Sequence, residues 1–494
     1  MLQDFFLLIF KTVNNPGTST ISKITCLALS VGLLTYTILR ACKLSFTHDE
    51  SFTYLYASHN SFMEIISNRT AITSSNNHLL NTLFMKLFES LFGSSEIVLR
   101  LQSILAHIAY LFLTYVLLKP LKSQFAIILG FVLLNVNPYL LEFFSLARGY
   151  ALAISFMLAS IWFLFRYMKE EKNKTLIGCY VFASLAVLSN FALLNYFASL
   201  LIIQQFFIYT KYRSIKINFQ KSKAVLTILV ILIAVLYEPL RKVIHQLDFG
   251  GVTGIWEDTV ASLIVSYLYK INYDFTVFKT IDGLVLVTIV GYFMLLIVAF
   301  LKKKMSETLQ YGATFFSVLI LIVTLNIIQH VVFGSAYLGE RFALFLVPLF
   351  VFVLIYLMDS IYQKGKAGKI ISIFLLAALT AMNVFHFNKA ANLQYATNWK
   401  YDADTKQMIS DLVHEKEISE KQHISLGITW VLEPAVNFYK VTKKLDWLEK
   451  ASRDGINNTN DFYYILPEDF QKLDTIRKTI LIRQYPISEG KLLK

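Results

Sequence analysis

The chain has 494 residues, of which 56% are hydrophobic and only 16% are charged, and its mean hydropathy is +0.55. Soluble globular proteins carry about 25% charged residues, so this chain has too few polar side chains to cover its apolar ones in water. The net charge of +13 lies almost entirely in residues 1–388, with 30 basic against 18 acidic residues. Such an excess is typical of basic loops beside a membrane, and we expect no nucleic-acid partner.

Eleven apolar stretches come close to the roughly 20 residues that a helix needs to cross a hydrocarbon core of about 30 Å. They lie near residues 22–41, 97–118, 124–141, 149–167, 175–190, 192–210, 224–240, 282–301, 312–333, 343–360 and 370–387. No cleavable signal peptide is evident, so the first stretch is expected to act as an uncleaved signal-anchor. The sequence predicts an all-α polytopic membrane domain, residues 1–388, with about 11 transmembrane helices.

Lysine and arginine occur in every second connection between these stretches. The basic connections contain Lys119 and Lys122, Arg166 to Lys174, Lys211 to Lys223, Lys302 to Lys304, and Lys364 to Lys369. Because basic loops stay in the cytoplasm, we predict a cytoplasmic N-terminus and an extracytoplasmic C-terminus. The expected location is the plasma (inner) membrane.

The first outer loop, residues 42–96, begins with His48, Asp49 and Glu50, directly after the first predicted helix. Adjacent carboxylates are not needed to build a membrane helix. They are therefore either ordinary solvated acids at the end of a loop or members of a functional site.

The second half of this loop is amphipathic. Residues 79–92 place their leucines and phenylalanines on one helical face, which predicts an interfacial helix in the headgroup plane. Asn77 and His78 precede this helix, and Gly93 is expected to end it. The loop would then be held at the membrane surface, as a roof over a lipid-derived substrate.

Two arginines stand at the outer ends of later helices. Arg148 precedes Gly149, and Arg341 follows Glu340. An arginine in this place either extends toward lipid headgroups or binds phosphate through its bidentate guanidinium fork. Together with two carboxylates on the same membrane face, the arginines suit a reaction in which a phosphate leaves and a hydroxyl attacks.

In this order, the motifs resemble the GT-C superfamily of polyprenyl-phosphate-sugar-dependent glycosyltransferases, and within it the bacterial protein O-mannosyltransferases and lipid A aminoarabinose transferases. The resemblance covers roughly residues 20–350. The residues that carry it are His48-Asp49-Glu50, Asn77 to Thr82, Leu91 to Ser94, Leu99-Arg100-Leu101, Ala147 to Tyr150, and Glu340 to Phe342 followed by Pro348.

The resemblance implies a membrane glycosyltransferase with a polyprenyl-phosphate-linked sugar donor. A hexosyl or pentosyl group would move to a hydroxyl of a lipid, glycan or protein acceptor at the outer face, with inversion at the anomeric carbon. Asp49 corresponds to the usual general base, and Glu50 is expected to shape the same catalytic site. The substrate-binding residues implied by the resemblance are Arg148, Arg341, Glu340, Tyr150, His78, Asn77, His48 and Arg100.

No cofactor is identified from the sequence. The chain has no Walker A loop and no glycine-rich dinucleotide fingerprint, and its cysteines, Cys26, Cys42 and Cys179, show no metal-ligand spacing. A divalent metal is therefore possible but is supported by no motif. Two other functions stay open, namely a transporter or lipid-linked-sugar flippase and a non-catalytic envelope scaffold, but charges at the helix ends favour the transferase.

Residues 389–494 differ in character, with 16 basic and 15 acidic residues and shorter apolar runs. We predict a small soluble α/β extracytoplasmic domain, with strands near 424–430, 462–466 and 479–483. Its aromatic residues include Trp399, Trp430, Trp447, Tyr463 and Tyr464. They either form the core of the domain or contact a sugar, and we expect the domain to cover the outer mouth of the site.

The predicted orientation can be tested with reporter fusions. Alkaline phosphatase fused after Lys494 should be active, because it folds only outside the cytoplasm, and a fusion in the 302–304 loop should be inactive. An inactive C-terminal fusion in cells that produce the full-length protein would overturn the orientation.

Overall fold

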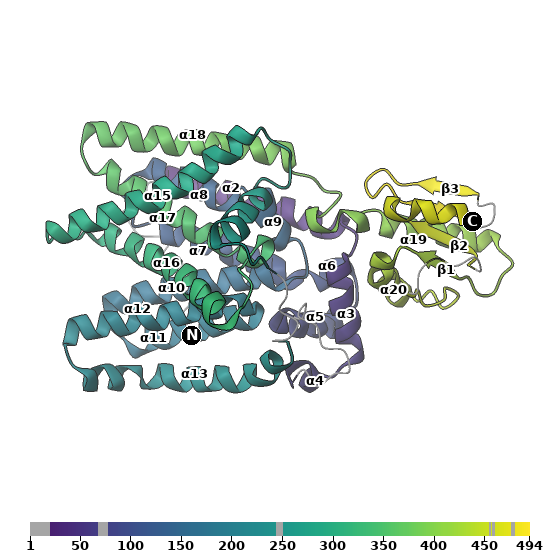
Figure 1. The fold of residues 1–494 in the computed structure, drawn as a ribbon, viewed down its shortest axis with the longest axis horizontal. Helices are drawn as coiled ribbons and strands as arrows, with labels where there is room; N and C mark the ends of the chain where they lie inside the picture. The colour runs from purple at the N-terminus through teal and green to yellow at the C-terminus, as the bar shows by residue number, and fades with distance from the viewer. Residues whose placement is uncertain (1–19, 68–77, 244–249, 454–455, 457–459, 476–479) are drawn as a thin grey trace.

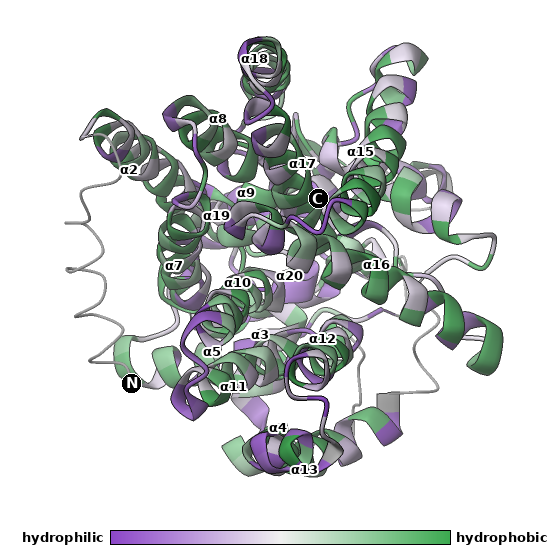
Figure 2. Ribbon diagram, turned by 90° about the vertical axis from the view of Figure 1, so that its left-hand side faces the viewer, coloured by the Kyte–Doolittle hydropathy of each residue, from purple (hydrophilic) through white to green (hydrophobic). Residues whose placement is uncertain are grey.

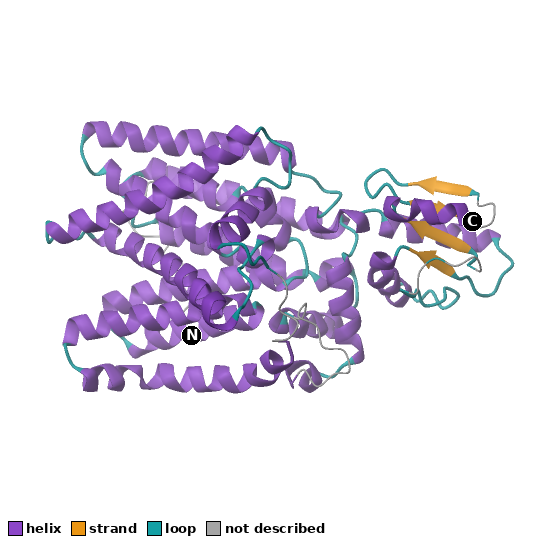
Figure 3. Ribbon diagram, in the orientation of Figure 1, coloured by secondary structure: helices purple, strands orange, loops and turns teal. Residues whose placement is uncertain are grey.

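The computed structural model describes residues 20–67, 78–243, 250–453, 456, 460–475 and 480–494, and consists of a helical bundle followed by a small C-terminal domain (Figure 1). Strands occur only in that domain within the described ranges, and helices make up most of the remainder (Figure 3). The short helices α3 to α6 lie between the bundle and the C-terminal domain.

The helical part of the chain begins with α2 (Thr20–Lys43), α3 (His48–His59), α4 (Phe62–Ser67), α5 (Leu79–Phe92), α6 (Glu96–Leu99), α7 (Leu101–Leu118), α8 (Gln124–Asn135), α9 (Pro138–Phe144) and α10 (Gly149–Glu170). It continues with α11 (Asn173–Ser189), η1 (Phe191–Leu193), α12 (Leu194–Tyr212), α13 (Ile215–Val243), η3 (Ile255–Ala261), α14 (Ser262–Tyr267), α15 (Phe275–Leu301), α16 (Glu307–Phe333), η4 (Glu340–Ala343), α17 (Leu346–Tyr362) and α18 (Lys366–Ala390).

Among the described residues, eight helices are long and apolar enough to cross a membrane, and α8 with α9 provides up to a ninth crossing. The helices α11 and α17 are apolar but have only 17 residues each. In Figure 2, α10 lies inside the bundle, whereas α15 lies at its edge. Only 11% of the apolar window of α15 is buried inside the protein. The predicted all-α multi-pass fold is confirmed, and the count of about 11 crossings stays a prediction.

The apolar stretch predicted at 124–141 is broken in two. Proline has no N–H and disfavours helical backbone in the residue before it, so α8 ends ahead of Pro138 and α9 starts at an angle of 66°. The side chain of Asn137 caps α9 by accepting a hydrogen bond from the backbone N–H of Leu140 at 2.9 Å. The break places α9 at the end of the bundle that faces the C-terminal domain, hereafter the domain-facing end (Figure 1).

The amphipathic helix predicted at 79–92 is present as α5, with its polar face turned toward the protein. Asn81 is fully buried and donates to the carbonyl of Ala147 at 2.9 Å. Leu91 and Phe92 are 61% and 63% exposed. A helix at a membrane surface is expected to turn its apolar side chains outward in this way.

The C-terminal domain holds a four-stranded sheet in the order β1-β2-β4-β3. Its elements are η5 (Thr397–Asp402), α19 (Thr405–Ile418), β1 (Leu426–Ile428), η6 (Trp430–Leu432), α20 (Glu433–Thr442), β2 (Phe462–Ile465), η7 (Pro467–Thr475), β3 (Leu481–Gln484) and β4 (Lys491–Leu493). The strands β1 and β2 are parallel, and β4 pairs antiparallel with β2 and β3. The three predicted strands are present, whereas β4 and α20 were not anticipated from the sequence.

The C-terminal domain shares one hydrophobic core with the first outer loop. Phe438 of α20 stacks on Phe46, with ring centroids 4.1 Å apart, and meets Tyr54 of α3 edge-on at 5.1 Å. The Tyr439 hydroxyl accepts a hydrogen bond from the backbone N–H of Phe46 at 2.9 Å and donates one to Glu96. The domain is therefore packed onto the loop that carries Asp49.

This shared core predicts that Phe438→Ala destabilises the packing of the C-terminal domain on the domain-facing end of the bundle. Replacing a fully buried phenylalanine by alanine costs about 3–5 kcal/mol of unfolding free energy, so the melting temperature of the purified protein should fall by several degrees. Ile418→Ala is the matched control, because Ile418 is 66% exposed and its loss should change little. Equal melting temperatures for the two variants would show that the interface does not stabilise the fold.

Candidate active site

Asp49 lies in the first turn of α3, close after the end of α2. Thr47 caps the helix, and its backbone N–H and hydroxyl both donate to Glu50 Oε2, at 3.0 and 3.1 Å. The sequence pattern Thr-x-x-Glu therefore forms a local helix start of the capping-box type. This start fixes the direction in which Asp49 projects.

Two arginines from distant parts of the chain meet the Asp49 carboxylate. Arg148, directly before α10, places Nη2 3.2 Å from Asp49 Oδ2, and its side chain is 1% exposed. Arg341, in η4, places Nη2 3.7 Å from the same oxygen and is 23% exposed. The structure thus brings together the three residues predicted to act as base and phosphate ligands.

Electrostatics keep Asp49 ionised. Burial by itself would raise the pKa of this carboxyl, but the charges of Arg148 and Arg341, with smaller contributions from His48 and Trp399, outweigh burial and lower the pKa below its ordinary value. One carboxylate and two guanidinium groups leave a local charge of about +1. The cluster therefore suits an anionic ligand.

Glu50 and Arg100 form a separate, fully buried ion pair. Arg100 donates through Nε and Nη2 to the two carboxylate oxygens, at 2.8 and 2.7 Å. Its other three N–H groups bond the carbonyls of Ala41, Leu44 and Ser45 at 2.8–3.0 Å. All five guanidinium donors are thus used, which leaves Arg100 none for a substrate. The predicted substrate contact of Arg100 does not fit this geometry, in which the guanidinium holds the end of α2 and the start of α3 together.

Glu50 also links this pair to the arginine motif. Its Oε1 accepts a hydrogen bond from the backbone N–H of Ala147 at 2.5 Å. Ala147 immediately precedes Arg148, so the carboxylate fixes α3 against the start of α10. Both carboxylate oxygens of Glu50 are occupied by these hydrogen bonds, so neither is free to interact with Asp49 or a ligand. This geometry is that of a positioning residue.

The segment between α18 and the sheet supplies a residue that motif reasoning did not place in the site. Trp399 is 2% exposed and lies beside Asp49. The guanidinium of Arg341 lies over its ring, 5.2 Å from the centroid. The sequence carried only a weak signal for this, namely an aromatic residue shortly after the last apolar helix.

Asp402 also joins the C-terminal domain to the loop. Its Oδ2 accepts a hydrogen bond from the backbone N–H of His48 at 2.6 Å. Burial, and then the nearby carboxylates of Asp49 and Glu50, raise the pKa of Asp402 well above its ordinary value. No motif in the sequence predicted this contact.

The predicted histidines make structural hydrogen bonds. His48 Nδ1 lies 2.6 Å from the carbonyl of Val431, and His78 Nδ1 lies 3.0 Å from that of Ser189. A carbonyl only accepts, so Nδ1 carries the proton in both rings. Burial, followed by the charge of Arg148, lowers the pKa of His78 well below its ordinary value and keeps this ring neutral.

Tyr150 lies inside the site, whereas Glu340 lies at its edge. The Tyr150 side chain is 1% exposed and meets His78 edge-on at 4.8 Å. Glu340 is 46% exposed and pairs with Lys270 at 3.5 Å. Asn77 lies outside the described residues. Among the described residues, no group of three or more His, Cys, Asp or Glu side chains could hold a metal.

Gly149 allows the arginine motif to pack closely. A Cβ atom at this position would lie 2.0 Å from the carbonyl oxygen of Ser189 and 2.7 Å from the His78 side chain. Any larger residue would push α10 away from both, and Arg148 with it. The glycine after the arginine is thus required by the close approach of three segments.

A second buried ion pair holds the segment that follows α18. Arg40 Nη2 lies 3.3 Å from Glu142 Oε2, and the same oxygen accepts from the Tyr269 hydroxyl and from the backbone N–H of Thr397, at 2.5 and 2.8 Å. Arg40 also donates to the carbonyl of Tyr395 at 3.0 Å. This network fixes the residues just before Trp399, and charged residues at the ends of apolar stretches were its only signal in the sequence.

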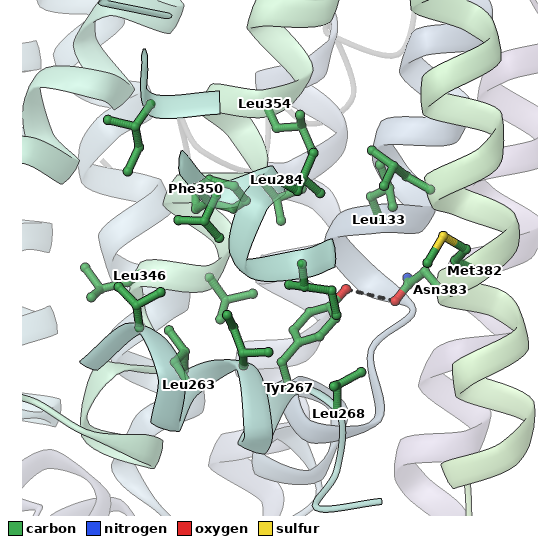
Figure 4. Close-up of a pocket in the computed structure, with 18 of the residues that line it drawn as sticks. Leu133, Leu263, Tyr267, Leu268, Leu284, Leu346, Phe350, Leu354, Met382 and Asn383 are labelled. Carbon is green, nitrogen blue, oxygen red and sulfur yellow. Dashed lines mark hydrogen bonds between the residues drawn. The ribbon is translucent and has the colours of Figure 1, made fainter. Parts of the chain in front are cut away.

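An apolar cavity of about 690 Å³ lies between α14 and the helices α15 to α18 (Figure 4). Leucine, valine and isoleucine side chains make up most of its wall, and Tyr267 donates to Asn383 Oδ1 across one side at 2.9 Å. Leu263 and Leu346 line the cavity, while Ser262 of α14 accepts a hydrogen bond from the backbone N–H of Glu340. The segment that carries Arg341 therefore borders the cavity.

The Glu50–Arg100 pair gives a test of how the site is held. Arg100→Met should lower the unfolding free energy by about 3–5 kcal/mol, because it leaves the Glu50 carboxylate buried and unpaired. Lys169→Met is the control, since the Lys169–Glu307 pair is 72% and 62% exposed and should contribute about 0–1 kcal/mol. Thermal unfolding of the purified variants measures both effects, and wild-type stability of Arg100→Met would contradict the positioning role.

Comparisons with known proteins agree with this architecture. A family model described as dolichyl-phosphate-mannose-protein mannosyltransferase matches residues 78–237. The search of curated proteins gave no significant match. The fold is similar to that of ArnT from Cupriavidus metallidurans in the apo state, with a TM-score of 0.54 and 9% identity over 94% of this chain and 97% of that chain. For ArnT from the same organism bound to undecaprenyl phosphate, the TM-score is 0.50 at 10% identity, over 96% and 98% of the two chains. The chain thus shares the fold of ArnT, and residues 78–237 match the mannosyltransferase family model, in agreement with the resemblance that its motifs indicated.

Proposed function

We propose that this protein transfers a sugar from a polyprenyl-phosphate donor to a hydroxyl acceptor at the outer face of the membrane. The observation that carries the proposal is the Asp49 carboxylate held between Arg148 and Arg341 at the domain-facing end of the bundle. A transporter or flippase needs ionisable groups along a path through the membrane. Here the charged cluster lies at one end, and the segment that carries Arg341 borders a hydrophobic cavity, which favours the transferase.

The donor's phosphate would bind the two guanidinium groups. Arginine presents a planar fork that matches phosphate oxygens, and Arg341 keeps part of its side chain exposed. A phosphodiester carries one negative charge, which balances the net charge of about +1 that Asp49, Arg148 and Arg341 leave. The same cations then stabilise the second negative charge that develops as the phosphate leaves.

The apolar cavity is suited to the lipid part of the donor. Its volume of about 690 Å³ falls within the roughly 300–1,000 Å³ of ligand sites in proteins. Its wall offers few polar groups, so it would take isoprenoid units rather than a sugar. Since the segment that carries Arg341 borders the cavity, a chain bound there would bring its phosphate toward the arginines. ArnT, whose fold this chain shares, has been observed with undecaprenyl phosphate bound.

The proposed reaction is a single displacement. The acceptor oxygen attacks the anomeric carbon, the bond from that carbon to the phosphate oxygen breaks, and the bonding electrons leave with the polyprenyl phosphate. Asp49 accepts the acceptor's proton as general base, a role typically worth about 10²–10⁴ in rate. Because attack and departure take place on opposite sides of one carbon, the configuration there is inverted.

Donor binding would also activate the base. In the free protein, Arg148 and Arg341 lower the pKa of Asp49 and so weaken it as a base. A phosphate that engages the same guanidinium groups adds a negative charge beside the carboxylate, which raises its pKa. Asp49 would therefore become a stronger base only when the donor is in place.

The orientation and the acceptor belong to the proposal as well. The alternating basic loops support a plasma (inner) membrane location, with the N-terminus in the cytoplasm and the site outside. Helix α20 of the C-terminal domain packs against α3, and the segment before the sheet contributes Trp399. Both contacts support a role for the domain at the mouth of the site. Trp430 is 52% exposed and is available to an acceptor, whereas Tyr463 and Tyr464 belong to the core of the domain.

Asp49→Asn tests the proposed base. The amide keeps the size of the side chain but cannot take the proton, so turnover should fall at least about 10²-fold while the melting temperature changes little. In the wild type, the lowered pKa of Asp49 keeps its carboxylate deprotonated down to about pH 5. Protonation of Asp49 in the donor-free enzyme should therefore cause no loss of kcat/KM between about pH 8 and 5. Transfer of radiolabelled sugar from undecaprenyl-phosphate donors measures both effects.

Asp411→Asn serves as the matched control, because Asp411 lies in the C-terminal domain and bonds Arg483 and Tyr485 away from the cluster. This variant should keep wild-type turnover. Full activity of purified Asp49→Asn would rule out Asp49 as the base.

A further inference from the structure

A group of buried polar side chains next to Asp49 lacks hydrogen-bond partners among the described residues. The atoms are the hydroxyls of Tyr139, Tyr150 and Ser266, both amide atoms of Asn398, and Nε of Arg341. The side chains of Tyr139, Tyr150 and Ser266 are at most 1% exposed, so bulk water does not reach them.

Tyr139 and Tyr150 pack, together with Trp399, around the ring of Phe143. The ring of Phe143 has Tyr150 at 4.7 Å, Tyr139 at 5.3 Å and Trp399 at 6.4 Å from its centroid. Arg341, which stacks on Trp399, lies near both phenols.

Helix α14 contributes Ser266 to the group, and the segment before Trp399 contributes Asn398. The Tyr139 hydroxyl lies near the side chains of Ser266 and Asn398, without hydrogen-bond geometry to either. The group therefore draws on α9, α10, α14, η4 and η5, and it adjoins the ion cluster of Asp49.

Two other buried tyrosines of the bundle have hydrogen-bond partners. Tyr110 donates to the carbonyl of Leu134 at 2.8 Å, and Tyr356 donates to that of Leu117 at 2.7 Å. Native proteins leave few buried polar atoms unpaired, and a concentration of them in one place indicates a ligand or ordered water. The contrast between Tyr139 and Tyr110 locates such a place beside the proposed base.

We propose that this group is the subsite for the sugar of the donor, and that the sugar is an uncharged polyhydroxylated one. The inference rests on the proposed function and names its substrate class. Phenol, hydroxyl and amide groups both donate and accept hydrogen bonds, as sugar hydroxyls do. The position beside Asp49 and Arg341 places such a sugar between the base and the phosphate ligands.

The charges of the subsite argue against an ionised sugar. An ammonium group would meet the net charge of about +1 that Asp49, Arg148 and Arg341 leave. Glu142 adds no net charge, because Arg40 balances its carboxylate through Oε2. Its other oxygen, Oε1, is buried without a hydrogen-bond partner among the described residues and is a further acceptor for a hydroxyl. A sugar carboxylate would compete with the donor's own phosphate for the two arginines.

The first test is a stability comparison in the absence of donor. Tyr139→Phe removes a buried hydroxyl that has no partner, so the melting temperature should stay unchanged or rise. Tyr110→Phe is the matched control, because it deprives the Leu134 carbonyl of its donor and should lower the melting temperature. A clear loss of stability in Tyr139→Phe would show that this hydroxyl has a structural partner and would overturn the subsite.

The second test measures binding to the purified full-length protein. The probes are undecaprenyl phosphate and its glucosyl, galactosyl, mannosyl, 4-aminoarabinosyl and galacturonosyl derivatives. In the wild type, one of the three neutral donors should bind more tightly than bare undecaprenyl phosphate and than both charged donors. Tyr139→Phe should weaken binding of that donor about fivefold, which corresponds to one hydrogen bond, and should leave bare undecaprenyl phosphate unaffected.

The outcomes separate the two proposals. If the wild type binds undecaprenyl phosphate but prefers a charged sugar, or if Tyr139→Phe keeps the full preference for the neutral sugar, the subsite is overturned and the proposed function stands. If the wild type binds neither bare nor glycosylated undecaprenyl phosphate, the proposed function fails, and the subsite fails with it.

Discussion

The buried ion pair between Glu50 and Arg100 is the interaction on which the arrangement of the site depends. Removing two charges from water is costly, and such a pair is tolerated only when its geometry is good and its remaining hydrogen-bonding groups are satisfied. Here the five guanidinium donors all have acceptors, and the carboxylate also binds the backbone of Thr47 and Ala147. The pair therefore ties the end of α2, the start of α3, the start of α7 and the residue before Arg148 into one rigid unit. The neighbouring Asp49 can then stand at a fixed distance from its two arginines.

The adjacent residues Asp49 and Glu50 show how environment divides two carboxylates between two roles. Glu50 is fully buried and saturated by one arginine, so it has no oxygen to offer to a reacting group. Asp49 shares two arginines through longer contacts, and one of them, Arg341, keeps part of its surface exposed. A ligand anion can compete for the second arrangement but not for the first. The difference follows from the α3 geometry, in which successive residues point in different directions.

The C-terminal domain and the membrane domain meet at the site. Asp402 binds the backbone at His48, Trp399 lies beside Asp49 and under Arg341, and Phe438 packs into the core of the first outer loop. The buried Arg40–Glu142 network fixes the connection between the two domains. A substitution in the C-terminal domain can therefore alter the geometry of the charged cluster through direct contacts. The domain is in this way linked to the proposed chemistry.

The sequence by itself determined the membrane class, the approximate helix positions, the amphipathic helix at 79–92 and the motifs that carry Asp49, Arg148 and Arg341, because hydropathy and helical periodicity are local properties. Only the tertiary structure decided how these residues are used. Arg100 and Arg148 look equivalent in the sequence. In the structure, however, all hydrogen-bond donors of Arg100 bind protein acceptors, whereas Arg148 pairs with Asp49. Nothing local places Trp399, Asn398 or Tyr139 near residue 49, since their proximity comes from the break before α9 and from the packing of segments that lie hundreds of residues apart along the chain. Which buried polar side chains find hydrogen-bond partners, and which are left for a ligand, depends on the packing of the whole bundle and cannot be read from local sequence.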